Sequence, residues 1–325
     1  MTDINLNKLP KFSELPVKQG APAESSWGVF GDDDELGTLN MLTTQGVIDA
    51  AKLVRKGRGF RIDTPLGYAN PPLFGRKPMK HTVISWREHG FLAFDDQLDV
   101  YNTQEGAQWD GYGHVGHLGA ERFYNGVKED EIKSGPDGRL GIHLWADKVI
   151  GRGVLADAFK YRADQGRPVN PGEPETYTVE DIQGALDAQG TKLAPGSILL
   201  VRTGWLQHYL ASSPEAKAAM APVTGLRACG IEASSATVEY LWDHRVAALG
   251  TDCPAVEQWP WDPKDLGALH YRTLALLGMP IGEQFDFEKL AADCADDDVY
   301  EFMFVSAPLN LVGGIASPPN GLAIK

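Results

Sequence analysis

Two continuous apolar runs constrain the fold of this chain more than any other feature of its sequence. They cover residues 197–203 (SILLVRT) and 246–251 (VAALGT). A short apolar run bounded by turn residues is typical of a strand that is buried on both faces of a sheet. Thr178, followed three residues later by Asp181, resembles a capping box for a helix that ends near Gly190. With a further helix expected over 233–243, this alternation predicts an α/β or α+β fold around a mixed sheet.

The remaining elements are predicted from periodicity, β-branched content and turn residues. Thr43 or Thr44 is expected to cap a helix that runs through Lys56. A strand pair is expected over 143–155, broken at Gly151 and Gly153. Further strands are expected over 60–64, 81–86, 92–101 and 302–311. A helix is expected over 270–277, ended by Gly278 and Pro280, and a turn over 313–319.

The domain organisation is predicted to be simple. The chain has 325 residues, and we find no internal repeat, low-complexity tract or linker in it. We expect one domain over 27–325, because single α/β domains of this length are common. Residues 1–26 contain Pro10, Pro16 and Pro22 and few apolar anchors. They are predicted to form an extended arm that packs on another surface or frays, and such an arm would suit exchange between subunits.

The charge balance argues against two classes of partner. Asp plus Glu number 44 and Lys plus Arg number 30, giving a net charge of −14. Such a chain is a poor partner for nucleic acid or an anionic membrane. No apolar run is long enough to span a membrane, and the polar residues 1–10 do not resemble a secretory signal. The three cysteines form no CxxC pair, so we expect a cytoplasmic protein.

The densest polar cluster lies in a glycine-rich segment, residues 104–119. Gln108 and Asp110 are two residues apart, so an extended backbone would point both to the same side, with His114 following if that geometry continues. An amide oxygen, a carboxylate and an imidazole on one edge can hold a divalent metal ion and supply a base. The alternative is that Asp110 caps a turn and His114 is a surface histidine.

Other patterns in the sequence favour little specific chemistry. Gly111, Gly113 and Gly116 form a literal GxGxxG, but no clear strand and helix flank it, so dinucleotide binding is disfavoured. There is no GxSxG elbow and no HExxH zinc helix. Cys253 could line a pocket, although a cysteine in such a context is more often a small core residue.

A second polar pair, His270 and Glu283, lies at the two ends of the segment HYRTLALLGMPIGE. A helix that opens at His270 and ends near Gly278 can bring the two side chains to one point. The alternative is a capping histidine and a solvated glutamate. Trp259 and Trp261, in the proline-interrupted segment QWPWDP, can form a pocket wall or anchor a buried loop.

Several short motifs in one order resemble the metal-dependent cyclase family, which includes kynurenine formamidase, isatin hydrolase and trans-dienelactone hydrolase. The family's metal loop has the form HxGTHxDxPxH, and residues 104–114 match it at Gly106, Asp110 and His114. Gln104 and Gln108 replace the first two histidines, Ala107 the threonine and Tyr112 the proline. The similarity extends to residues 27–43, 199–205, 249–257, 270–284 and 307–320.

The resemblance implies a swivelling β/β/α domain around a mixed sheet or barrel, and a Zn²⁺ or Mn²⁺ ion. Carried over by position, Asp110, His270 and Glu283 resemble metal ligands, Gln108 falls at a further ligand position, and His114 falls at the position of the catalytic histidine. Because both loop histidines are replaced, we expect one metal ion per chain instead of two. The share of oxygen ligands slightly favours Mn²⁺. The resemblance also implies a homodimer or homotetramer.

The expected function is hydrolysis of a C–N or C–O acyl bond in a small cyclic or acyl amide or lactone. Metal-activated water would attack the substrate while His114 acts as the general base. An aromatic wall for a planar substrate is expected from four residues, Trp109, Tyr112, Trp259 and Trp261. Two alternatives remain open at this stage, a cyclase or lyase without net hydrolysis and an inactive small-molecule-binding protein on the same fold.

Overall fold

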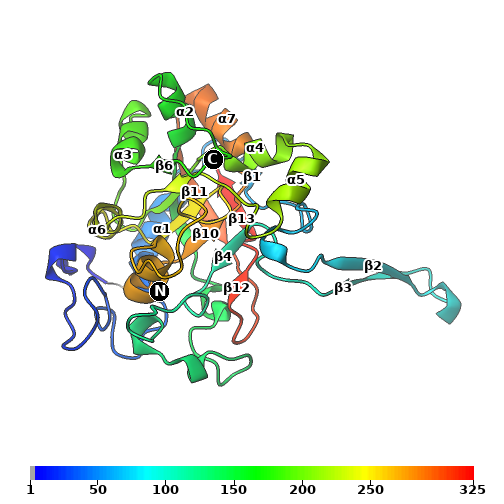
Figure 1. Cartoon of the computed structure of the whole chain (residues 1–325), viewed down its shortest axis with the longest axis horizontal. Helices are drawn as coiled ribbons and strands as arrows, with labels where there is room; N and C mark the ends of the chain where they lie inside the picture. Colours follow the sequence, from blue (N-terminus) through cyan, green and yellow to red (C-terminus); the bar gives the residue numbers. More distant parts are fainter. Residues whose placement is uncertain (1–3) are drawn as a thin grey trace.

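A mixed sheet of nine strands organises the computed structural model, which describes residues 4–325 (Figure 1). The strand order is β1-β13-β11-β5-β7-β9-β10-β4-β12. Four central strands run parallel to one another: β5 (Ile150–Ala156), β7 (Ile198–Val201), β9 (Ala248–Thr251) and β10 (Ile281–Glu283). The outer strands pair antiparallel: β1 (Gly59–Arg61), β4 (Gln108–Asp110), β11 (Glu301–Ser306), β12 (Ala316–Ser317) and β13 (Gly321–Ile324). The predicted α/β architecture around a mixed sheet is confirmed.

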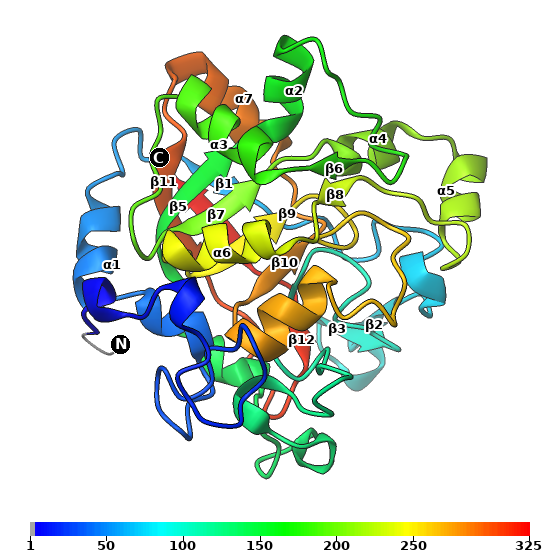
Figure 2. The ribbon, with the colours of Figure 1, turned by 60° about the vertical axis from the view of Figure 1, so that its left-hand side comes forward.

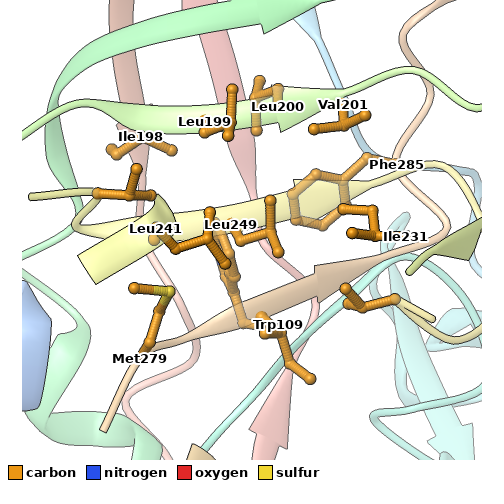
Figure 3. Packing of buried hydrophobic residues seen from close by; sticks show 14 of the residues in the cluster. Trp109, Ile198, Leu199, Leu200, Val201, Ile231, Leu241, Leu249, Met279 and Phe285 are labelled. Atoms are coloured by element: carbon orange, nitrogen blue, oxygen red, sulfur yellow. The ribbon is translucent and has the colours of Figure 1, made fainter. Parts of the chain in front are cut away.

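The two apolar runs form adjacent central strands, as predicted. All four residues of β7 and of β9 are buried. Leu199 of β7 pairs with Val154 of β5 on one side and with Leu249 of β9 on the other. Figure 3 shows the apolar side chains around these strands, with Phe285 packed beside them. A strand inside a parallel sheet is covered on both faces, which is why its sequence lacks the alternation of a half-exposed strand.

Helices cover the sheet, and Figure 2 shows α3 and α6 in front of its central strands. The capping box is present, since the Oγ1 atom of Thr178 accepts from the backbone N–H of Asp181. The α-helices are α1 (Thr44–Ala51), α2 (Ala158–Asp164), α3 (Val179–Ala188), α4 (Trp205–Ala211), α5 (Pro214–Met220), α6 (Ser235–Asp243) and α7 (Glu288–Asp297).

The first predicted helix is shorter than expected. Thr43 is its N-cap, accepting from the N–H of Gly46 at 3.0 Å, but α1 ends at Ala51 and not at Lys56. The backbone N–H of Leu53 bonds to the carbonyl three residues earlier, which tightens and ends the helix. Val54, which fitted the helical spacing, is exposed.

The predicted strand pair over 143–155 is wrong. A short 3₁₀ helix (Ile142–Trp145) is followed by the single strand β5, which passes through both glycines. A Cβ atom on Gly153 would lie 2.3 Å from the ring of Phe302 on the neighbouring β11. The glycine therefore admits an aromatic side chain across the strand pair, and it does not break the strand.

The C-terminal third contains three further departures from the prediction. The expected helix over 270–277 is a π-helix, Tyr271–Leu277, that ends at Gly278 with φ of 58°. The expected turn over 313–319 contains β12, the edge strand beside β4. β11 covers only the first half of the strand predicted over 302–311.

The N-terminal segment packs on its own chain. The backbone N–H of Phe12 donates to Asp243 at 2.8 Å, and the indole of Trp242 donates to the carbonyl of Pro10 at 2.9 Å. The segment around Pro10 and Phe12 is therefore held against α6 of its own chain. The exchange between subunits that the sequence suggested stays a prediction. Residues 1–3 of the predicted arm lie outside the described residues.

Two small sheets lie outside the main one. Strands β6 (Thr176–Tyr177) and β8 (Gly230–Ile231) pair parallel. Strands β2 (Lys80–Ser85) and β3 (Phe94–Asp99) form an antiparallel hairpin that extends away from the body of the molecule (Figure 1). Across residues 4–325, no helix combines the length and the apolar character needed to cross a membrane. The three cysteines are free and buried.

Candidate functional site

Strand β4 carries the first residues of the candidate site. It lies between β10 and β12, and its Gln108 is the register partner of Glu283 at the end of β10. Side chains alternate along a strand, so Gln108 and Asp110 face one side while Trp109 faces the other. The antiparallel register thus brings Glu283 beside Gln108, although 175 residues separate them in the sequence.

The structure gathers all five predicted metal and catalytic residues in one place. One ligand atom each from Asp110, His114 and His270 lie within 4.8 Å of one another. Gln108 donates through Nε2 to Oε2 of Glu283 at 2.8 Å, and Oε1 of Glu283 lies 3.3 Å from Nε2 of His270. His114 is the most accessible member, with 27% of its side chain exposed. The polar cluster is otherwise buried.

Glu257 orients His270. Its Oε2 atom lies 2.9 Å from Nδ1 of the imidazole, and both side chains are buried. An ionised carboxylate only accepts, so Nδ1 carries the proton and Nε2 is left with its lone pair when the ring is neutral. Glu257 was absent from the residues expected at the site, although the similarity over 249–257 had included it.

When the His270 ring is neutral, two acceptor atoms face each other inside the cluster. Nε2 of His270 and Oε1 of Glu283 are 3.3 Å apart, and within residues 4–325 that oxygen has no hydrogen-bond donor. Oε1 of Gln108 is likewise buried without a donor among the described residues. Buried acceptors are costly unless a proton or a cation lies between them. The two carboxylates and the imidazole nitrogen fit a divalent metal ion. The amide of Gln108 turns its Nε2 toward Asp110 and Glu283, so its oxygen can join this set only after the amide rotates.

The pKa values of Glu283 and His270 are both shifted by burial and by neighbouring carboxylates. Burial, followed by the charge of Asp110, raises the pKa of Glu283 to about 7. Burial alone would lower the pKa of the His270 imidazole, but the carboxylates of Glu257 and Glu283 raise it well above its usual value. The protein itself therefore concentrates negative charge that only a proton or a cation can balance.

His114 is held by Gln104, which takes the place of the family's first histidine. Nε2 of Gln104 lies 2.9 Å from Nδ1 of His114 and 3.2 Å from Oδ1 of Asp110. Burial lowers the pKa of His114, and Asp110 opposes this only in part. The side chain is thus neutral near pH 7 and able to accept a proton. The sequence marked Gln104 only as a lost ligand and gave no sign of this contact.

Arg76 is a second residue that the sequence did not indicate. Its Nη1 atom donates to the carbonyl of Gln104 at 2.6 Å. Burial lowers the pKa of its guanidinium, while Glu283 and Asp110 act in the opposite sense. Its positive charge therefore lies within electrostatic reach of the carboxylates. Nothing in its local sequence, PPLFGRKP, distinguishes it from a surface arginine.

The predicted aromatic wall divides into two halves. Trp109 and Tyr112 are fully buried, donating to Ser306 and to the carbonyl of Leu36, so neither is placed to contact a substrate. The strand alternation that turns Gln108 and Asp110 toward the site turns Trp109 into the core beside Phe285 (Figure 3).

Trp259 and Trp261, in contrast, lie beside the cluster. The ring of Trp261 stacks on His270 with centroids 5.9 Å apart, and Trp259 meets Trp261 edge to face. Both are half-buried. Cys253 is fully buried, and burial raises the pKa of its thiol well above the usual value, so it resembles a core residue more than a nucleophile.

Comparisons with known proteins agree with one another. The profile of the Cyclase family matches residues 58–258. The crystal structure of a novel cyclase shares 33% identity with this chain, covering 93% of it and 97% of that chain, with a TM-score of 0.81. No curated protein matches the sequence.

Two isatin hydrolases show the same fold at lower identity. Isatin hydrolase A from Labrenzia aggregata, bound to benzyl benzoate, is 16% identical, covers 85% of this chain and 96% of its own, and has a TM-score of 0.56. An isatin hydrolase bound to the product analogue thioisatinate is also 16% identical, covers 86% and 98%, and has a TM-score of 0.57.

Proposed function

Because this chain belongs to the Cyclase family, we propose that it is a metal-dependent hydrolase of small cyclic or acyl amides or lactones. The observation that carries the proposal is the approach of Nε2 of His270 to Oε1 of Glu283, 3.3 Å apart beside the buried Asp110, which requires a proton or a cation between them. A binding surface for a neutral organic molecule has no need of such a concentration of buried negative charge.

We assign one divalent ion, Mn²⁺ or Zn²⁺, to a ligand set of Gln108, Asp110, His270 and Glu283. Three of these four residues offer oxygen, which favours Mn²⁺. When bound, such an ion polarises a substrate carbonyl and lowers the pKa of water from about 15.7 toward about 7. Glu257 fixes the ring of His270 so that Nε2 faces the carboxylates.

His114 is assigned the proton transfers. Its partial exposure places it between the buried carboxylates and solvent, and its lowered pKa keeps it neutral near pH 7. It takes a proton from the attacking water and returns one to the leaving nitrogen or oxygen. Gln104 holds the ring in place during both steps. General catalysis of this kind typically contributes 10²–10⁴-fold to the rate.

A planar ring is the substrate shape that the surroundings favour. Trp261 and Trp259 present half-buried aromatic faces beside His270. Arg76 is placed near enough to balance a carboxylate released by hydrolysis. The isatin hydrolases with the same fold bind benzyl benzoate and thioisatinate, which both contain aromatic rings.

The test combines metal analysis with turnover. The purified protein is analysed for bound metal and screened against small lactones, cyclic imides and N-acyl aromatics, with and without EDTA. We expect about one Mn or Zn per chain and chelator-sensitive hydrolysis. Reactions in ¹⁸O-water separate hydrolysis, which incorporates the label into product, from a cyclase or lyase reaction, which does not. Failure to bind either metal on titration would reject the assignment and favour a binding protein.

A further inference from the structure

A cavity of about 330 Å³ lies where the hairpin β2–β3 joins the main sheet. Its lining comes from β1, from β3, from the segments that follow these two strands, and from the chain on either side of β12. Among the described residues, none that we assign to the metal ion or to proton transfer is part of this lining. A cavity of this volume is at the small end of those that hold organic ligands.

Glu105 is the unusual member of the lining. Its side chain is buried at 3% exposure, and neither carboxylate oxygen has a hydrogen-bond partner within residues 4–325. Burial raises the pKa of Glu105, and the backbone of Met79 and the charge of Arg76 oppose this only in part. A buried carboxylate is costly unless a proton or a cation balances it. The cavity therefore contains an acidic group that lacks a partner.

Asp63 and Tyr101 add to the negative potential of the cavity. Asp63 accepts from the backbone N–H of Gly321 at 3.1 Å, and burial raises its pKa against the effect of that hydrogen bond. Burial, followed by the charges of Glu105 and Asp63, raises the pKa of Tyr101 to about 12. The phenol therefore lies within electrostatic reach of both carboxylates and stays neutral near pH 7. The face of such a ring attracts a cation.

Two arginines lie near the cavity, but neither neutralises Glu105. Arg61 is exposed, and its charge acts on Asp63. Arg76 donates to the carbonyl of Gln104 at 2.6 Å, and the carboxylates of the candidate site affect its pKa more than Glu105 does. The positive charge that Glu105 lacks is therefore expected to come from a bound molecule.

The remaining lining limits what that molecule can be. Leu66, Leu98 and Leu309 line the cavity and are 47%, 46% and 36% exposed, so the outer part of the cavity is apolar. A divalent metal ion fits less well, because it needs more oxygen ligands than two carboxylates supply. Within residues 4–325, the group of three side chains suited to a metal ion is the one at Asp110.

We propose that this cavity binds a small organic cation, a primary amine on an apolar body. The ammonium group donates to Glu105 and lies against the ring of Tyr101, while the apolar body packs on the three leucines. An ammonium group has three N–H donors, enough for the two unpartnered oxygens of Glu105. The site is separate from the proposed hydrolytic reaction and does not depend on it.

The experiment measures binding of cyclohexylmethylamine by calorimetric titration, with cyclohexylmethanol as the uncharged compound of the same shape. We expect wild type, with or without Mn²⁺, to bind the amine about tenfold or more tightly than the alcohol. Glu105→Gln should weaken binding of the amine by a similar factor. Glu239→Gln, the same change at an exposed position on α6, should leave it unchanged.

Asp110→Asn separates this cavity from the candidate metal site. It removes a charge from the metal site but leaves the cavity intact, so its affinity for the amine should equal that of wild type. Loss of binding in Asp110→Asn would instead place the amine at the metal site and overturn the proposal.

A second variant tests the cavity without altering Glu105. Leu309→Lys puts an ammonium group of the chain itself at the lining, and repulsion should weaken binding of the amine about tenfold or more. Leu210→Lys on α4, where Leu210 is 46% exposed, is the matched control. Circular dichroism checks that the variants fold. The proposal is overturned if wild type binds the amine no better than the alcohol, or if Glu105→Gln and Leu309→Lys both keep the affinity of wild type.

Discussion

Oε2 of Glu257 lies 2.9 Å from Nδ1 of His270, and neither side chain is accessible enough for water to replace the other. This contact determines which nitrogen of His270 carries the proton. It therefore determines that Nε2, the atom 3.3 Å from Glu283, is the one that faces the buried carboxylates.

Replacing Glu257 with Gln should weaken metal binding while leaving the ligands in place. An amide orients the ring less firmly and can stabilise the wrong tautomer, so affinity for Mn²⁺ or Zn²⁺ should fall about 10–100-fold. Calorimetric titration measures this, and Glu239→Gln, at an exposed position on α6, is the control. Unchanged affinity in Glu257→Gln would show that Glu257 has only a structural role.

Replacing Asp110 with Asn should abolish metal binding and activity together. The change keeps the shape of the buried side chain but removes the charge at the centre of the cluster. Metal ions stabilise a protein only when they bind its folded form. Added Mn²⁺ should therefore raise the melting temperature of wild type but not of Asp110→Asn. Equal stabilisation of both proteins would remove Asp110 from the ligand set.

Replacing His114 with Ala should remove activity but not metal. Loss of the general base should lower kcat about 10²–10⁴-fold, which corresponds to roughly 3–5 kcal/mol of barrier. Because burial lowers the pKa of His114, the acid limb of kcat/KM in wild type should lie below pH 6.5 and vanish in the variant. His117→Ala is the control. Loss of bound metal in His114→Ala would instead make His114 a ligand.

Two tryptophan substitutions should affect different properties, one the stability of the protein and the other its binding of substrate. Trp109→Ala removes a fully buried ring and its hydrogen bond to Ser306, and should cost about 3–5 kcal/mol of unfolding free energy. Trp261→Ala should cost about 1 kcal/mol or less, but raise KM for an aromatic substrate. Urea denaturation and steady-state kinetics measure the two effects. A variant of Trp109 that raised KM without loss of stability would return it to the substrate wall.

A group of charges at the C-terminus should make stability depend on acid pH. Burial opposes ionisation of Asp297, but hydrogen bonds from Lys325 and Lys56 outweigh it and lower its pKa to about 2. The native pKa lies below the unfolded value of 3.8, so this stabilisation is complete above pH 4 and is lost as the pH falls toward 2. Between pH 4 and pH 2, the unfolding free energy of Asp297→Asn should therefore fall by about 1 kcal/mol less than that of wild type, as measured by urea denaturation. Parallel curves of unfolding free energy against pH for the two proteins would contradict this expectation.

Local patterns predicted the elements whose surroundings are uniform. The run at 198–201 forms a strand covered on both faces, and Thr178 and Asp181 form a capping box, because each depends only on residues close in sequence. Part of the candidate site could be predicted from the sequence for the same reason. The two-residue spacing of Gln108 and Asp110 is enough to place both on one face of a strand, and it equally requires Trp109 to face the core.

The sequence did not predict which strands pair with one another or in which register. The pairing of β10 with β4 brings Glu283 to Gln108, and packing of the loop before the π-helix brings Glu257 to His270. Neither contact has a local signal, since sequence spacing fixes no distance between separate strands. The same holds for the hairpin, whose strands the sequence predicted but whose position outside the core it did not. The sequence determined which residues can hold a cation, and the tertiary structure alone decided which of them meet, because the free energy of burying them together depends on the whole sheet.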